Sequence, residues 1–97
     1  MKTFYSDYVQ HCMRFYARYT NPEFYNVVDE LNWYACDDAL KDFADIQRDT
    51  LLAIYRSADT IPSNIRNLSV TKGFEQDAIW KLVNSLERKV AEKRGLI

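Results

Sequence analysis

The side chains best suited to chemistry lie between positions 66 and 88 of this 97-residue chain. Glutamine and asparagine can hydrogen-bond to the edges of DNA bases, while lysine and arginine bind phosphate oxygens. The candidate DNA-binding set is Arg66, Lys72, Gln76, Trp80, Lys81, Asn84 and Arg88. Gln76 and Asn84 are the expected base readers, and the four cations are the expected phosphate contacts. Trp80 either contacts a partner or packs on the N-terminal helices.

Small and apolar residues around this set have the spacing of two helices joined by a tight turn. Gly73 is expected to end the first helix in a left-handed conformation, and Phe74 to fill the space beneath the turn. Ser69 is small enough to let the helices approach closely. The inward positions of the unit are Ile65, Leu68, Ile79 and Leu82. The second helix would then present its opposite face to a DNA major groove.

The segment from residue 39 to the end resembles the helix-turn-helix of sigma-70 region 4, as found in small sigma-like proteins of phages and conjugative elements. The similarity is carried by Leu40, Phe43, Arg48, the run Leu51-Leu52-Ala53-Ile54-Tyr55 and the unit 65–86. It implies a non-enzymatic transcription regulator of a mobile element that binds double-stranded DNA, beside RNA polymerase or another protein. The sequence departs from the pattern at the turn, where Glu75 and Gln76 replace the usual Ser or Thr cap, and at Lys72 and Asp77.

Helices must position these residues, and the periodic spacing of apolar residues predicts an all-α domain of about five helices. With only two glycines and two prolines, the chain lacks the turns of an all-β fold. The expected helices run from Ser6 or Asp7 to about Tyr19, from Pro22 (with Asn21 as its cap) to about Leu40, from 43–45 (capped by Asp45 or Asp42), from Pro62 or Ser63 to Lys72, and from 75 to 94. We expect one compact bundle over 1–97, with an aromatic part at 1–41 and a helix-turn-helix part at 42–97.

Three apolar stripes are expected to form the core. The first helix contributes Tyr5, Tyr8, Val9, Cys12, Phe15, Tyr16 and Tyr19, the second Phe24, Val27, Val28, Leu31, Tyr34 and Ala35, and the last Ala78, Ile79, Leu82, Val83, Leu86 and Val90. The N-terminal tyrosines have a second interpretation, an exposed interface for a homodimer or a protein partner.

Charge divides the chain into two opposed parts. Residues 1–62 hold six basic and ten acidic side chains, a net charge of −4, whereas residues 63–97 hold seven and four, a net charge of +3. A charge of +3 suits a weak DNA reader that needs a dimer or a polymerase beside it. The acidic, aromatic part favours the alternative function, a protein-binding adaptor or inhibitor.

Several function classes are excluded by what the sequence lacks. The aspartates between 37 and 49 have no accompanying base, nucleophile or oxyanion loop, so we expect no enzyme and no catalytic residue. His11 is the only histidine and no Cys-x-x-Cys pair exists, so we expect neither a metal nor another cofactor. No apolar run could span a membrane and no signal peptide precedes the chain, which predicts a cytoplasmic protein. Cys12 and Cys36 are then free thiols.

Overall fold

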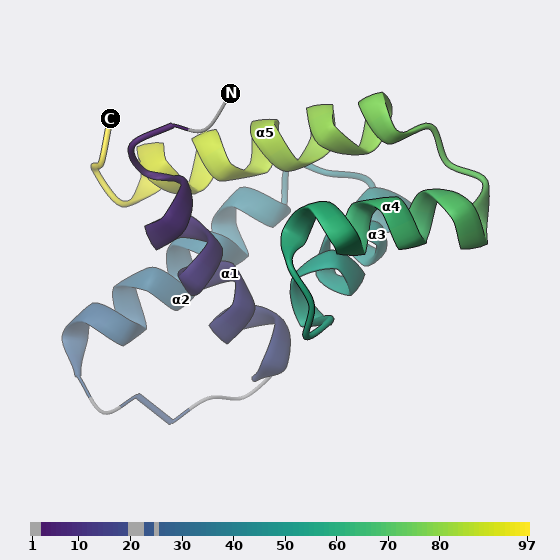
Figure 1. Cartoon of the computed structure of the whole chain (residues 1–97). Helices are drawn as coiled ribbons and strands as arrows, with labels where there is room; N and C mark the ends of the chain where they lie inside the picture. Colours follow the sequence, from purple (N-terminus) through teal and green to yellow (C-terminus); the bar gives the residue numbers. More distant parts are fainter. Residues whose placement is uncertain (1–2, 20–22, 25) are drawn as a thin grey trace.

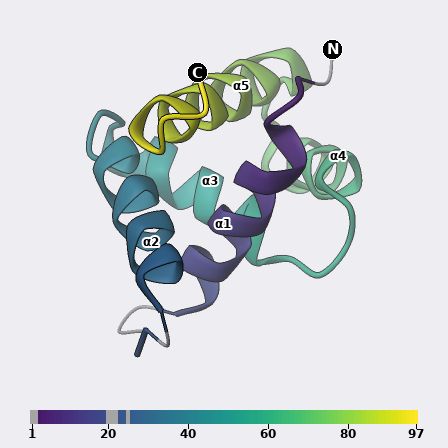
Figure 2. The same cartoon turned by 90° about the vertical axis from the view of Figure 1, so that its left-hand side faces the viewer.

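The computed structural model describes residues 3–19, 23–24 and 26–97, and its regular elements are all helices. The chain forms α1 (Ser6–Arg18), α2 (Val27–Leu40), α3 (Asp45–Arg56), α4 (Ile61–Lys72) and α5 (Gln76–Lys93). The predicted all-α fold with five helices is confirmed. α5 runs along one outer side of the molecule and packs against each of the other four helices (Figures 1 and 2). α1 packs against both α2 and α3.

The core lies where α3 meets α1 and α5. Its largest fully buried side chains include Leu51, Ile54 and Tyr55 of α3, Val9 and Met13 of α1, and Val83, Leu86 and Val90 of α5. Cys12 and Cys36 are buried and free, as predicted. Burial raises the pKa of the Cys12 thiol to about 11 and also raises the pKa of Cys36, because a low-dielectric surrounding disfavours the thiolate.

Local capping corrects the expected starts of α2 and α4 and the expected cap of α3, which begins at Asp45 as predicted. α2 begins five residues after Pro22, because the side chain of Asn26 accepts a hydrogen bond from the Asp29 backbone N–H (2.9 Å). The expected cap Asn21 and Pro22 itself lie outside the described residues. α3 is preceded by Ala44 instead of an aspartate cap, and the Gln47 side chain accepts from the Ala44 N–H (3.0 Å).

α4 begins at Ile61, one residue before the expected start. The Thr60 hydroxyl accepts a hydrogen bond from the Ser63 N–H (3.3 Å), so Thr60 is the N-cap. Pro62 then falls in the first turn, where its missing N–H leaves no helical hydrogen bond unmade. α5 spans 76–93, within one residue of the prediction at each end.

The predicted buried stripe of α2 is correct at Ala35 but wrong at its four large apolar residues within the helix. Val27, Val28, Leu31 and Tyr34 are exposed by 67, 51, 49 and 50% respectively. The helix instead turns a different face to the core, formed by Asn32, Ala35, Cys36, Ala39 and Leu40. Small side chains on that face let α1 and α5 approach closely, so packing selects it over the bulkier one.

The aromatic stripe of α1 is also only partly buried. Tyr8 and Tyr19 are exposed, while Tyr5, Phe15 and Tyr16 are half-buried. The Tyr16 hydroxyl donates to Asp37 (2.7 Å), which keeps the ring at the surface between α1 and α2. The fully buried positions of the helix are instead taken by smaller or more flexible side chains, which are Ser6, Val9, Cys12, Met13 and Ala17.

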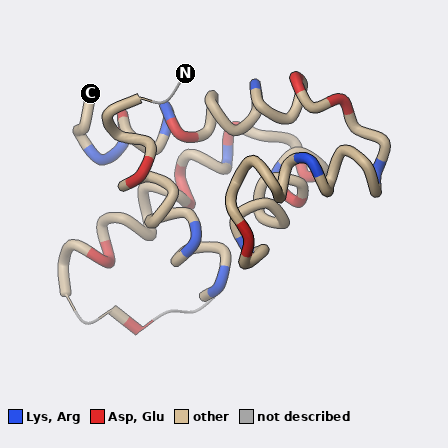
Figure 3. The backbone as a smooth tube through the Cα atoms, viewed as in Figure 1, with Lys and Arg blue, Asp and Glu red and all other residues tan. Residues whose placement is uncertain are grey.

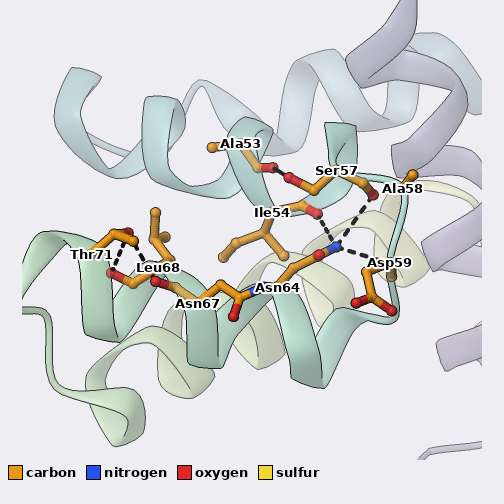
Figure 4. A pocket seen from close by; sticks show the side chains of 9 residues that line it. All are labelled: Ala53, Ile54, Ser57, Ala58, Asp59, Asn64, Asn67, Leu68 and Thr71. Carbon is orange, nitrogen blue, oxygen red and sulfur yellow. Dashed lines mark hydrogen bonds between the residues drawn. The ribbon is translucent and has the colours of Figure 1, made fainter.

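Two polar side chains, one from α4 and one from α1, hold the connection between α3 and α4 by hydrogen bonds. Asn64 is buried, and its Nδ2 donates to the carbonyl oxygens of Ile54 (2.9 Å), Ser57 (3.3 Å) and Asp59 (3.1 Å) (Figure 4). The Arg14 guanidinium of α1 donates to Ser57 (2.8 Å) and Asp59 (2.7 Å). Carbonyl oxygens at the end of a helix have no helical N–H to accept from, and here Asn64 and Arg14 supply the missing donors. The same hydrogen bonds set the direction in which α4 leaves the connection.

Glu87 of α5 is buried, which is rare for a carboxylate. Its Oε2 accepts a hydrogen bond from the hydroxyl of Tyr55 (2.7 Å). Burial raises the pKa of Glu87, and hydrogen bonds from Tyr55, Gln10 and Ser6 oppose that shift. Glu87 therefore links α5 to α3 and α1.

Two absences in the described part of the chain concern a membrane span and a metal site. No helix there is both long and apolar enough to cross a bilayer. No group of three or more histidine, cysteine or carboxylate side chains is gathered there in a way that would hold a metal ion.

Candidate nucleic-acid interface

The turn between α4 and α5 is built on Gly73. This residue has φ +72° and ψ 18°, the left-handed conformation that glycine adopts without strain, and its N–H donates to the Ser69 carbonyl (2.9 Å). The Ser69 hydroxyl reaches across the turn to the carbonyl oxygen of Phe74 (2.5 Å). After three residues α5 starts and runs back across the molecule in the opposite direction (Figure 1). The predicted glycine end of α4 is confirmed.

The apolar contacts of this two-helix unit differ in part from the expected ones. Ile65 and Ile79 are buried as predicted, and Leu68 and Leu82 are half-buried. Phe74 does not plug the space beneath the turn: it is 38% exposed and lies beside Ile46 of α3, which is itself 68% exposed. The three-residue turn carries Phe74 out past the first turn of α3, where too little protein surrounds the ring to bury it.

Polar side chains line the outer face of α5. At about 100° per residue, the predicted α5 residues fall within an arc of roughly 140° around the helix. Five residues of this arc are exposed, and we call them the α5 face: Gln76, Asp77, Lys81, Asn84 and Arg88. The prediction that Gln76, Lys81, Asn84 and Arg88 point to solvent is confirmed.

The charges of the α5 face are mixed. Figure 3 shows acidic and basic positions alternating along the helix. Asp77 lies one turn before Lys81 within the face. Glu92 lies one turn beyond Arg88, with its carboxylate 3.3 Å from the Arg88 guanidinium. A phosphate backbone would therefore meet two cations that neighbouring carboxylates partly neutralise.

The two cations predicted on α4 do not share a face. Arg66 and Lys72 are both exposed, but six residues separate them, which places them roughly 120° apart around the helix. Lys72 lies at the end of α4 beside a shallow hollow that Asp49 and Phe74 also line. The structure thus brings together the α5 residues of the predicted set and separates the α4 ones.

Trp80 packs between helices and is not part of the α5 face. It is half-buried, packs against the core, and lines a cleft with Ser6 and Gln10 of α1 and Ile61 of α4. Of the two roles expected for it, packing on an N-terminal helix is the one found.

Sequence reasoning missed the polar residues that position this unit, namely Arg14, Asn64 and Glu87. A signal existed for Asn64, because positions 61, 64, 65 and 68 recur at helical spacing and share one face of α4. An asparagine on a face that is otherwise apolar predicts a buried side chain with specific partners. Arg14 and Glu87 carried no such signal, since their partners come from distant parts of the chain.

The chain matches no protein-family model, no curated protein and no solved structure. Geometry and chemistry alone therefore support the function proposed below.

Proposed function

We propose that the protein is a non-enzymatic DNA-binding regulator of transcription, and that the α5 face enters the major groove of double-stranded DNA. The observation that carries the proposal is the free face of α5, which follows a tight glycine turn and presents glutamine, lysine, asparagine and arginine together. A B-DNA major groove is about 12 Å wide and admits one α-helix. α5 lies along an outer edge of the molecule in both views (Figures 1 and 2), and residues of α1 and α4 border one side of the face at the cleft that Asp77 and Asn84 line.

Each side chain of the α5 face has a distinct role in this proposal. Gln76 and Asn84 are two helical turns apart, and their amides hydrogen-bond to base edges, most readily to adenine. Lys81 and Arg88 bind phosphate oxygens and supply the salt-dependent part of the affinity. Asp77 lies among them and repels phosphate, so the binding is weak in the absence of a second contact.

Fluorescence anisotropy with a labelled random-sequence DNA duplex tests the proposal, at about 25 mM and about 150 mM salt. We expect binding at low salt that weakens as salt rises, because bound phosphates release counterions. Lys81→Ala should reduce the slope of log affinity against log salt by about one unit. Lys93→Ala is the matched control, since Lys93 is exposed on the same helix outside the α5 face.

A gain-of-affinity variant guards against misreading a folding defect. Asp77→Asn removes a negative charge from the exposed α5 face and should strengthen DNA binding several-fold at low salt. The proposal is wrong if the wild-type chain does not bind at low salt. The α5 face is the wrong surface if Lys93→Ala weakens binding as much as Lys81→Ala does, or if Asp77→Asn has no effect.

A further inference from the structure

An exposed apolar strip runs along the outer side of α2. Val27, Leu31 and Tyr34 lie within roughly 60° of one another around the helix, and Val28 adjoins them at the first turn. We call these four residues the α2 face. All are exposed by about half or more, whereas soluble chains usually show large apolar residues singly. A contiguous strip of this kind is typical of a protein-binding surface.

The fold leaves the α2 face uncovered. α1 and α5 pack on the side of α2 that buries Ala35, Cys36 and Ala39, and Val27, Leu31 and Tyr34 point away from both. In Figures 1 and 2, α2 lies at an outer edge of the molecule with no helix beyond it. It is separate from the proposed DNA-binding surface, because the α5 face begins at the far end of the molecule, beside the turn after α4.

Carboxylates border the α2 face along one side and at its C-terminal end. The helix contains four acidic residues (Asp29, Glu30, Asp37 and Asp38) and no basic residue. Glu30 and Asp38 are exposed within roughly 60° of Val27 around the helix. Two cations lie against α2: Lys41 at its C-cap is held by Asp38 (3.2 Å) and Asp37 (3.7 Å), and Arg94 donates to Asn32 on another side of the helix. The strip is therefore apolar along its length, with Glu30 along one side and Asp38 at its C-terminal end.

Aromatic contacts hold one end of this surface in place. The Tyr34 ring lies 5.2 Å from Trp33 and 6.0 Å from Phe24, and Trp33 also contacts Tyr16 of α1 at 4.9 Å between ring centroids. The Trp33 indole N–H donates to the Tyr19 carbonyl (3.1 Å). A partner would thus meet side chains that are already ordered, and it would pay little conformational entropy to bind them.

We propose that the α2 face docks a basic amphipathic helix of a protein partner. A helix with apolar residues at i, i+3, i+4 and i+7 matches the strip on α2, and lysines or arginines beside its apolar face would lie opposite Glu30 and Asp38. A second copy of this chain fits less well. Antiparallel pairing of two α2 helices through this face would bring Glu30 of one copy near Asp38 of the other, and like charges repel. The inference does not depend on DNA binding.

Isothermal titration calorimetry with designed peptides tests the docking. The probe is an 18-residue helical peptide with leucine at i, i+3, i+4 and i+7 and lysine elsewhere. Two control peptides accompany it, one with glutamate replacing lysine and one with the same composition but leucines spread around the helix. We expect the amphipathic lysine peptide to bind at least tenfold more tightly than either control.

Matched variants locate the binding on α2. Leu31→Ser and Val27→Ser should each weaken binding of the lysine peptide by fivefold or more, and Glu30→Gln should weaken it several-fold. Val70→Ser is the control, because Val70 is a 78% exposed valine on α4. The affinity of this variant for the lysine peptide should stay within twofold of the wild-type affinity. Circular dichroism would verify that each variant folds.

Three results would overturn the inference. The first is no binding of the lysine peptide, and the second is equal binding of the glutamate peptide. The third is a dimer, seen by light scattering of the free protein, that Leu31→Ser dissociates, since a second copy would then occupy the α2 face. Loss of peptide binding in Leu31→Ser with unchanged DNA binding would separate this surface from the α5 face.

Discussion

Asn64 is expected to contribute more to stability than its polarity suggests, because one side-chain amide serves three carbonyl oxygens. Two of these, on Ser57 and Asp59, also accept from Arg14 and would stay partnered if Asn64 were lost. Within the described part of the chain, the carbonyl of Ile54 accepts a side-chain hydrogen bond from Asn64 alone. Asn64→Ala therefore leaves one buried carbonyl unpartnered, a loss of about 1–3 kcal/mol.

Urea denaturation followed by circular dichroism measures this cost. We expect Asn64→Ala to lower the free energy of unfolding by about 2 kcal/mol, which corresponds to a fall in Tm of about 8–16 °C for a domain of this size. Asn67→Ala is the matched control, since Asn67 is an exposed asparagine on the same helix, and it should change stability by less than about 0.5 kcal/mol. Equal effects of the two variants would refute the reasoning.

A double mutant sharpens the test. In Arg14→Ala combined with Asn64→Ala, the carbonyls of Ser57 and Asp59 lose both donors, whereas each single mutant leaves one. The double mutant should therefore lose more stability than the sum of the singles, by about 0.5–3 kcal/mol. Strict additivity would mean that the two side chains act independently and that the shared carbonyls contribute nothing.

Three further predictions concern Glu87, the turn glycine and the thiols. Burial raises the pKa of Glu87, so the folded chain keeps the carboxyl proton to higher pH than the unfolded chain does. The free energy of unfolding therefore falls as pH rises above the ordinary pKa near 4.5. Glu87→Gln does not titrate, and in denaturation curves its stability relative to wild type should increase from pH 4 to pH 8. Gly73→Ala should cost about 1 kcal/mol in the same assay, because φ is +72° although an added Cβ would meet nothing within 4 Å. Cys12 and Cys36 should react with a thiol reagent only after unfolding, and rapid reaction of the native protein would contradict their burial.

The amino-acid sequence by itself determined the helical class and most helix boundaries of this protein. Apolar spacing and the scarcity of glycine and proline predicted five helices, and Gly73 marked the end of α4 because only a residue without a Cβ adopts that conformation cheaply. Local sequence also determined the polar character of the α5 face, since α5 has a single apolar stripe and the residues opposite it must meet water.

Tertiary structure decided which face of α2 is buried. That helix carries apolar residues on two sides, and periodicity alone does not choose between a stripe of Val27, Leu31 and Tyr34 and one of Cys36 and Ala39. The choice follows from two neighbouring helices that approach closely only over small side chains. Glu87 is a second such case, because its burial depends on a hydroxyl donor that lies 32 residues away in the chain. Both outcomes depend on the shapes and donors of distant segments, which the local sequence does not contain.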